Sequence, residues 1–318
     1  MIYDTIIIGT GPAGLTASLY ASCFHLTHIV IGKVFGGQMM LAPEIINYPG
    51  FTEISGQNLS RQMINQVKLR GGQLFEDIVV VVEKEGTGFL VKTKLRKTYQ
   101  ALSIILATGT DRKRLNVPGE LEYINRGVHY CVVCERQDYQ GKVVAVVGGG
   151  NAAIQGVVQL AHLAAKVILF VRSSEIRADA VWVSEMKQHN NIEVCYNTKV
   201  LGIVGDGNKL TSVKVLTDSQ EKNISLDKFF VEIGGVPGTA LVSPLGVAMD
   251  PGGYIHVDGK LSTNIPGVFA AGDLVSYGLS IEQISSAVGL GARAAASAFS
   301  YLKEGKAPSA WGSTLIKR

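Results

Sequence analysis

The sequence predicts an α/β fold, because the same series of an apolar run, a glycine-rich turn and a helical stretch occurs twice. The first copy begins at residues 5–8 and continues through GTGPAG at 9–14. The second begins at residues 143–147 and continues through GGGNAA at 148–153. A buried strand that leads through such a turn into a helix is typical of a dinucleotide-binding unit. Since 318 residues are enough for two domains, we expect two Rossmann-like dinucleotide-binding domains.

The first turn, called here the first glycine cradle (residues 9–14), suits a pyrophosphate. Gly9 permits the tight turn, Gly11 lets the backbone approach the ligand, and Gly14 lets helix and strand pack closely. The following helix, expected over residues 15–24, presents free N–H groups to an anion at its N-terminus.

Polar residues after the next strand predict the lining of a flat ligand. This strand is expected at residues 28–31, and Gly32 then stands where many dinucleotide folds have an acidic residue for the ribose hydroxyls. Two turn-rich pieces follow, FGGQM at 35–39 and INYPGF at 46–51, in which single polar side chains lie among apolar ones.

Periodicity predicts the elements between the two copies. Residues 56–70 have the pattern of an amphipathic helix, and residues 75–93 alternate and turn as a β-meander does. Residues 103–106 form another buried strand, which ends in a turn at Gly109, and Pro118-Gly119 marks a domain crossing.

The second turn, called the second glycine cradle (residues 148–153), has Ala153 in place of the third glycine, a common variant. The next strand, at residues 167–171, leads into RSSEIR at 172–177, where an arginine can contact a ribose 2′-phosphate. Strands are expected near Val194, Val213 and Phe229. The residues leave three interpretations of the second glycine cradle open. It binds NADPH, it binds another adenine nucleotide such as a second flavin, or it is a vestigial site without a ligand whose arginines are solvated.

Near the C-terminus, the run GVFAAGD at 267–273 predicts a strand that ends in Gly272-Asp273. A carboxylate there suits a ribityl or ribose hydroxyl of a flavin. The next helix is expected from about Glu282 to Tyr301, and the dipole at its N-terminus would stabilise the negative charge of a reduced flavin.

Cys131 and Cys134 form a C-x-x-C pair, whose spacing allows a disulfide and often lowers the pKa of one thiol. A zinc site would need two further ligands at short spacing, and Cys23 and Cys195 each stand alone, so no metal site is expected. Redox activity is favoured over inert packing. His129 either tunes the thiolate or packs locally.

Composition narrows the class of protein. The hydrophobic content of 47% suits two sizeable cores, and four cysteines do not make a secreted disulfide framework. The formal net charge is only +4, and no basic run alternates with aromatic residues, so nucleic acid is not an expected partner. No apolar span is long enough to cross a bilayer, which predicts a cytoplasmic protein without a membrane partner.

These motifs resemble those of the low-molecular-weight thioredoxin reductases, which are flavoproteins with two dinucleotide-binding domains. The resemblance extends over nearly the whole chain through GTGPAG, GGQ at 36–38, INYPGF, ATG at 107–109, CVVC at 131–134, GGGNAA and GVFAAGD. It implies a three-layer ββα architecture in which the second domain is inserted into the first. Residues 1–116 and 236–318 would form the FAD-binding domain, and residues 117–235 an NAD(P)-like domain with the redox-active pair.

The resemblance also implies roles for individual residues. Cys134 would face the flavin, Cys131 would exchange with a substrate disulfide, and Glu135 would donate the proton. The FAD site would comprise Gly9, Gly11, Pro12, Ala13, Gly14, Gly36, Gly37, Gln38, Asn47, Gly109, Gly272, Asp273, Glu282, Gln283 and Ile284. A second nucleotide site would comprise Gly148, Gly150, Asn151, Ala152, Arg172 and Arg177.

Departures from the family pattern concern the electron donor. NADPH-using members have H-R-R-x-x-x-R where this chain has VRSSEIR at 171–177, which lacks the His and one Arg and adds Glu175. Glu282-Gln283 replaces the Arg-Gln of the family. We therefore expect an atypical thioredoxin reductase, a homodimer that takes electrons from ferredoxin or a second flavin. The alternatives are an ordinary NADPH-dependent enzyme, a dithiol oxidase that uses oxygen, and a non-enzymatic redox sensor.

Overall fold

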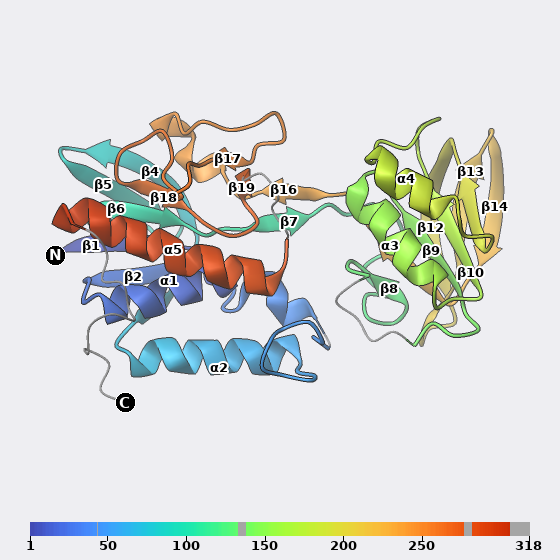
Figure 1. The fold of residues 1–318 in the computed structure, drawn as a ribbon, viewed down its shortest axis with the longest axis horizontal. Coiled ribbons are helices and arrows are strands. Elements are labelled where there is room, and N and C mark those ends of the chain that lie inside the picture. Colours follow the sequence, from blue (N-terminus) through green and yellow to red (C-terminus); the bar gives the residue numbers. More distant parts are fainter. Residues whose placement is uncertain (43, 133–137, 277–281, 306–318) are drawn as a thin grey trace. The chain divides into compact units, whose positions relative to one another are not determined.

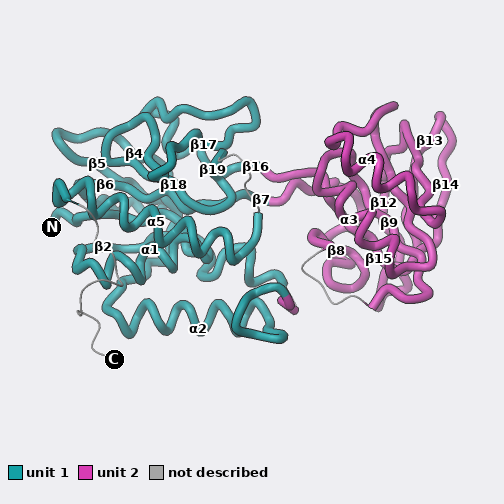
Figure 2. Tube along the Cα trace, viewed as in Figure 1, with its two compact units in different colours: residues 1–42, 47–111, 236–318 teal, residues 43–46, 112–235 magenta. Residues whose placement is uncertain are grey.

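The structure, a computed structural model, describes residues 1–42, 44–132, 138–276 and 282–305. The chain forms two compact units, one of residues 1–42, 47–111 and 236–318 and the other of residues 43–46 and 112–235 (Figure 2). Apart from the short segment of residues 43–46, the chain passes between them at Asp111–Arg112 and at Gly235–Val236, the two crossings named below, so Pro118-Gly119 lies within the second unit.

A sheet of seven strands forms the centre of the first unit (Figure 1). Its order is β3-β2-β1-β6-β5-β4, and β18 also pairs with β6. The strands are β1 (Ile2–Ile8), β2 (His28–Gly32), β3 (Gln73–Glu76), β4 (Val79–Glu85), β5 (Gly88–Thr93), β6 (Thr98–Leu106) and β18 (Val268–Ala270). The predicted meander over residues 75–93 is wrong at its start. β3 pairs with β2 in the parallel part of the sheet. Only the consecutive strands β4, β5 and β6 form an antiparallel meander.

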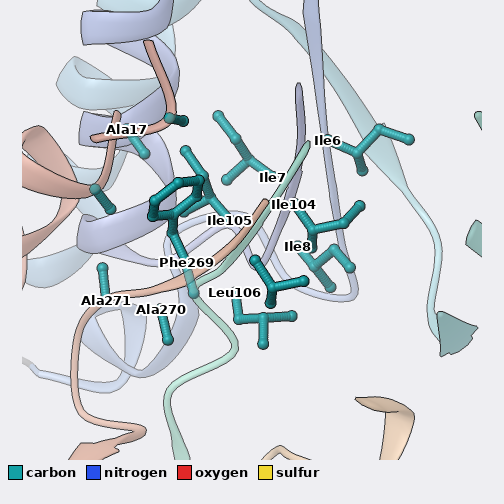
Figure 3. Close-up of a cluster of buried hydrophobic side chains, with 14 of the residues drawn as sticks. Ile6, Ile7, Ile8, Ala17, Ile104, Ile105, Leu106, Phe269, Ala270 and Ala271 are labelled. Atoms are coloured by element: carbon teal, nitrogen blue, oxygen red, sulfur yellow. The ribbon is translucent and has the colours of Figure 1, made fainter. Parts of the chain in front are cut away.

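Three α-helices lie in the described part of this unit: α1 (Pro12–Cys23), α2 (Gly56–Leu69) and α5 (Ile284–Lys303). Small residues let α1 and α5 approach closely, because a Cβ at Gly291 would lie 2.2 Å from the Ala13 carbonyl oxygen. Two short 3₁₀ helices, η1 (Gly37–Leu41) and η2 (Ala240–Leu245), also occur. Apolar side chains of β1, β6 and β18, such as Ile7, Ile105 and Phe269, form one core with α1 (Figure 3).

The second unit has three layers. Its parallel sheet has the order β11-β10-β9-β15-β8 and consists of β8 (Val128–His129), β9 (Val143–Val147), β10 (Lys166–Phe170), β11 (Ile192–Cys195) and β15 (Lys228–Val231). Helices α3 (Asn151–Ala161) and α4 (Ala180–Met186) contribute to one core. An antiparallel sheet of β12 (Thr198–Gly205), β13 (Leu210–Thr217) and β14 (Gln220–Ser225) contributes to the other.

Alternate side chains of β9 enter the two cores. Val144 and Val146 pack in the core with α3, whereas Ala145 and Val147 pack in the core with β12 and β13. A parallel strand that is buried on both faces needs such a continuous apolar run. The predicted α/β fold with two dinucleotide-binding units is confirmed.

Short strands complete the fold. The two crossings between the units, β7 (Thr110–Arg112) and β16 (Gly235–Pro237), pair with each other, as do β17 (Ile255–His256) and β19 (Val275–Ser276). Among the described helices, none is long and apolar enough to cross a membrane.

Candidate functional site

The first glycine cradle joins β1 to α1, and two of its glycines are required by the fold itself. Gly9 has a φ of +118°, and a Cβ there would lie 2.0 Å from the carbonyl oxygen of Ala107. A Cβ at Gly14 would lie 1.9 Å from the carbonyl oxygen of Gly9. No side chain fits at either position, so the turn can only be this tight with glycine.

Gly11 differs, because the fold leaves room there. Its φ is −76°, which any residue can adopt, and the nearest described atom to a Cβ would be the Gly37 Cα at 4.0 Å. Gly11 is also the N-cap of α1, and no side chain in the described residues caps this helix. The open space at the N-terminus of a helix suits the pyrophosphate of FAD, which a side chain at Gly11 would displace.

The loop after β2 forms a second wall of this site. Gly36 N–H donates to the Thr10 carbonyl oxygen at 2.7 Å, and the Thr10 hydroxyl donates to the Val34 carbonyl oxygen at 2.8 Å. A Cβ at Gly32 would lie 2.4 Å from Thr10 Oγ1. An acidic side chain for the ribose therefore has no room at Gly32. Gln38 Nε2 donates to the Thr110 carbonyl oxygen and, at 3.3 Å, approaches Thr110 Oγ1.

The C-terminal part of the chain returns to the same site. Gly272, with a φ of +87°, follows β18, and a Cβ there would lie 3.0 Å from the Cβ of Ala13 in α1. Asp273 comes directly after it. Gly109, which lies between β6 and β7, has a φ of +63°, and its carbonyl oxygen accepts a hydrogen bond from Gly238 N–H at 3.1 Å.

Two residues before α5 connect it to other segments of the first unit. Asn47 Nδ2 donates to Gln283 Oε1 at 2.9 Å, and Gln283 is the N-cap of α5, which starts at Ile284. Burial and then the neighbouring charges of Glu282, Asp250 and Asp273 raise the pKa of Tyr254, which also hydrogen-bonds to Glu282. The structure thus brings the residues predicted for FAD into one region of the first unit.

The second glycine cradle joins β9 to α3 in the same manner. Gly148 has a φ of +155°, and a Cβ there would lie 2.3 Å from the Glu232 carbonyl oxygen. Gly150 is the N-cap of α3, and no described atom lies within 4 Å of its Cβ position. Arg177 N–H donates to the Gly149 carbonyl oxygen at 2.7 Å, so the loop after β10 folds back onto this turn.

Acidic side chains accompany the two arginines of this loop. Arg172, Glu175 and Arg177 are all exposed. Asn151 Nδ2 donates to Asp179 Oδ2 at 3.0 Å, and Asp179 N–H donates back to Asn151 Oδ1 at 2.8 Å. Ala152 is exposed beside Asn151. The carboxylate of Asp179 therefore lies at the N-terminus of α3, where a nucleotide phosphate would bind.

Cys131 follows β8 and is disulfide-bonded, whereas Cys23 and Cys195 are free thiols. Cys134 and Glu135 lie outside the described residues. His129 is buried, and its ring centroid lies 5.4 Å from that of Phe230. Within the described part of the chain, no three His, Cys, Asp or Glu residues are grouped as metal ligands.

Two acidic residues that were not predicted hold the segment around Cys131. Glu120 is 1% exposed, and its carboxylate accepts hydrogen bonds from Tyr130 Oη at 2.9 Å, Leu115 N–H at 2.9 Å and Asn116 N–H at 2.7 Å. Burial and then Glu120 raise the pKa of Tyr130. Glu232 Oε1 accepts from Val132 N–H at 3.3 Å, and Glu232 Oε2 lies 3.5 Å from Arg112 Nη1.

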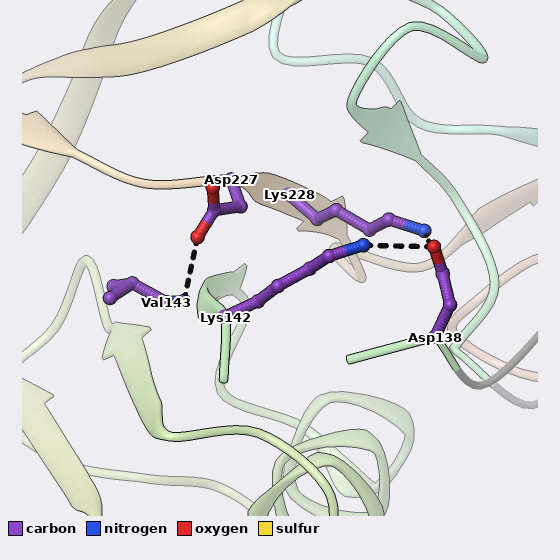
Figure 4. A network of polar contacts seen from close by, with 5 residues as sticks. All are labelled: Asp138, Lys142, Val143, Asp227 and Lys228. Atoms are coloured by element: carbon purple, nitrogen blue, oxygen red, sulfur yellow. Dashed lines mark hydrogen bonds and ion pairs between the residues drawn. The ribbon is translucent and has the colours of Figure 1, made fainter. Parts of the chain in front are cut away.

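A third acidic residue, Asp138, comes after residues 131–134 in the sequence, which are called here the redox segment, and it is part of a polar network (Figure 4). Its carboxylate pairs with Lys142 Nζ at 2.8 Å and Lys228 Nζ at 2.7 Å. Partial burial opposes the charge, but the two lysines outweigh it and lower the pKa of Asp138 to about 2. Lys228 Nζ also lies 5.0 Å from the ring centroid of Tyr139, which is fully buried. This network attaches the chain after the redox segment to β15 and to the residue before β9.

Comparisons with known proteins identify the family of the chain. The profile of the pyridine nucleotide-disulphide oxidoreductases matches residues 3–291. A thioredoxin reductase of Listeria innocua is 39% identical over 95% of this chain and 95% of its own length. The structure of a Streptococcus pyogenes thioredoxin reductase is 34% identical, with a TM-score of 0.85 over 95% of this chain and 99% of that one. An atypical thioredoxin reductase from Desulfovibrio vulgaris Hildenborough is 30% identical, with a TM-score of 0.52 over 94% of this chain and 98% of that one.

The predicted resemblance is thereby confirmed at the level of the family. The family profile and the relatives both extend over most of the chain, through both glycine cradles and Cys131. The chain therefore belongs to the low-molecular-weight thioredoxin reductases among the pyridine nucleotide-disulphide oxidoreductases, and it is a flavoprotein disulfide oxidoreductase.

Proposed function

We propose that this chain reduces the disulfide of thioredoxin or of a similar small dithiol protein through its Cys131–Cys134 pair. The observation that carries the proposal is the disulfide at Cys131, in a chain whose two cysteines outside the C-x-x-C are free thiols. The names of the thioredoxin reductases from Listeria innocua and Streptococcus pyogenes support this choice of substrate.

FAD would bind to the first unit. The open space at Gly11 would receive its pyrophosphate, with Gly37 opposite, and Asp273 and the N-terminus of α5 would complete the site. When bound, FAD supplies the two-electron chemistry that reduces the disulfide. The residues of the chain bind and orient the cofactor, and the dipole of α5 favours negative charge at its N-terminus.

The two sulfurs would have separate roles in exchange. The Cys131 thiolate attacks the substrate disulfide, forms a mixed disulfide and displaces one substrate thiolate, which takes a proton. The Cys134 thiolate then attacks Cys131 Sγ, restores the pair and releases the second substrate thiol. We propose Glu135 as the residue that gives the proton, and a homodimer as the active form.

A donor-independent experiment tests this function. The enzyme is reduced photochemically without oxygen and mixed with oxidised thioredoxin, and thioredoxin thiols are counted. One thioredoxin disulfide should be reduced for every two electrons that the enzyme holds in its flavin and its cysteine pair, and Cys134→Ser should trap thioredoxin on Cys131. If fully reduced enzyme leaves thioredoxin oxidised, the proposed function is wrong, and peroxide release with dithiols would indicate an oxidase instead.

We further propose that the donor is not NADPH but ferredoxin or another flavin. The carboxylates of Glu175 and Asp179 accompany Arg172 and Arg177 around the second glycine cradle, and they repel a doubly charged 2′-phosphate. The atypical thioredoxin reductase of Desulfovibrio vulgaris among the similar structures supports an atypical member of the family. The cradle itself does not read the 2′-position, so a second FAD is the alternative ligand there.

Anaerobic titration of the flavin band tests the donor. Reduced ferredoxin should bleach the flavin quickly, and micromolar NADPH slowly or not at all. Glu175→Arg should strengthen NADPH binding roughly tenfold or more, since one charge contact is worth about 1.5–3 kcal/mol. Glu221→Arg makes the same charge change in β14, where Glu221 pairs with Lys214 at 2.6 Å, and it should have no effect. Fast stoichiometric reduction of wild-type enzyme by NADPH would contradict the proposal.

A further inference from the structure

Glu232 links the redox segment to the crossing strand β7. It follows β15 directly, and its backbone is fixed by a hydrogen bond from its N–H to the Val147 carbonyl oxygen at 2.9 Å. Its side chain is 8% exposed, accepts a hydrogen bond from Val132 N–H at 3.3 Å and lies 3.5 Å from Arg112 Nη1. A buried carboxylate in such a place interacts electrostatically with every charged group near it.

The Cys131 sulfur is close to this carboxylate for covalent reasons. Cys131 Sγ is joined to Val132 N through Cβ, Cα and the carbonyl carbon, and Val132 N–H donates to Glu232. Standard bond lengths therefore place the sulfur within about 8 Å of Glu232 Oε1. Val132 itself is 2% exposed and packs on α3 at Gly156, where a Cβ would lie 2.8 Å from Val132 Cγ2. Val132 and the Glu232 side chain are buried and Cys131 is half-buried, so water screens the carboxylate from the sulfur less than it would at the surface.

The ionisable groups that the printed contacts of the described residues place around Cys131 include His129 in β8, Tyr130 with its partner Glu120, Arg114 near Tyr130, Arg112 in β7 and Glu232 after β15. On α3, Val132 faces Gly156, which carries no charge.

We propose that the buried charge of Glu232, offset by Arg112, sets the balance between thiol and thiolate at Cys131. Glu232 is then a positioning residue for the exchange reaction, and the proposal rests on the function proposed above. A nearby negative charge disfavours the thiolate, and a nearby positive charge favours it. In the intact pair, the opposite effects of Glu232 and Arg112 on the pKa of Cys131 partly cancel. The loss of either partner leaves the effect of the other without that compensation.

The two partners can be removed separately. Glu232→Gln keeps an oxygen for Val132 N–H but removes the negative charge and leaves Arg112, so the pKa of the Cys131 thiol should fall by about one unit. Arg112→Gln removes one positive charge and keeps the Glu232 carboxylate, so the pKa of the Cys131 thiol should rise by about one unit. A structural disturbance alone would not shift the same thiol in opposite directions.

The rate of alkylation of Cys131 by iodoacetamide, followed by peptide mass spectrometry in reduced enzyme from pH 5 to 10, measures this pKa. Cys23 and Cys195 are internal references in the same samples, and Glu221→Gln is the control for loss of one carboxylate. Opposite shifts at Cys131 with unchanged reference thiols would support the proposal. Shifts of the same sign, or none in Arg112→Gln, would overturn it, and this second variant decides the matter if Glu232→Gln does not fold.

The outcome is separable from the proposed function, because alkylation requires no turnover. Opposite shifts in an enzyme that cannot reduce thioredoxin would refute the function and leave the effect of Glu232 standing. Efficient reduction of thioredoxin by variants whose Cys131 pKa does not move would refute the effect of Glu232 alone.

Discussion

Replacement of Gly11 by alanine should separate cofactor binding from folding. The φ of −76° is compatible with alanine, and the added Cβ would meet only the Gly37 Cα, at the ordinary contact distance of 4.0 Å. The same methyl group would occupy the space at the N-terminus of α1 that the pyrophosphate needs. The fold should therefore tolerate Gly11→Ala, whereas FAD should not.

The two effects differ in magnitude. Alanine is a poorer N-cap than glycine, which costs about 1 kcal/mol of stability at most. Loss of two charge-assisted hydrogen bonds from backbone N–H groups to the pyrophosphate costs about 3–6 kcal/mol, which is roughly 10²- to 10⁴-fold in affinity for FAD. Gly150→Ala is a matched control for the FAD of the first unit, because Gly150 is the N-cap of α3 in the second unit and its Cβ position is equally open.

The assay is titration of FAD into apoprotein, followed by flavin fluorescence, together with thermal unfolding of the two apo variants. Both variants should unfold within a few degrees of wild-type apoprotein. Only Gly11→Ala should lose FAD affinity. Wild-type affinity in Gly11→Ala, or equal loss in Gly150→Ala, would refute the assignment of FAD to the first glycine cradle.

Three further predictions concern ionisable side chains. Asp138→Asn should lower the free energy of unfolding by about 1 kcal/mol or less at pH 7. Since the pKa of Asp138 is lowered to about 2 in the folded state, the difference between the variant and wild type in denaturant unfolding should disappear as the pH falls from 3.8 towards 2. Glu120→Gln should lower the free energy of unfolding by about 1–3 kcal/mol in the same measurement, because at least one of the three donors to this buried carboxylate loses its acceptor. Burial lowers the pKa of His28 below 6.5, so the folded state binds fewer protons and stability should fall as the pH drops below about 6.5; a wild-type pH slope in His28→Gln would contradict this.

Elements defined by their own residues could be predicted from the sequence, and elements defined by distant partners could not. The strand expected at residues 143–147 agrees with β9, because a continuous apolar run is what a doubly buried parallel strand requires. The helix after the second glycine cradle ends at Ala161. The carbonyl groups of Ala161 and of Ala164, which lies three residues beyond the helix, accept hydrogen bonds from Asn191 Nδ2 at 2.9 and 3.0 Å, and no local pattern predicts such a distant partner.

The same distinction applies to the candidate site. Both glycine cradles are local, since the glycines, the strand and the helix are adjacent in sequence, and they were found. Glu232 was missed because its partners Val132 and Arg112 lie far away in the chain. Glu120 was missed although its partners are nearby, because a single acidic residue between Gly119 and Leu121 belongs to no recognisable motif.

The sequence nevertheless contains one signal for Glu232. It interrupts FFVEIGG at 229–235, an apolar run that reads as a buried strand. An isolated buried carboxylate costs several kcal/mol, so it is tolerated there only with a cation and hydrogen-bond donors nearby. The partners turn out to be Arg112 and Val132 N–H, one on the crossing strand and the other beside the redox sulfur. A charged residue at the end of a buried apolar run, near a reactive site, therefore predicts a buried partner of opposite charge or a hydrogen-bond donor.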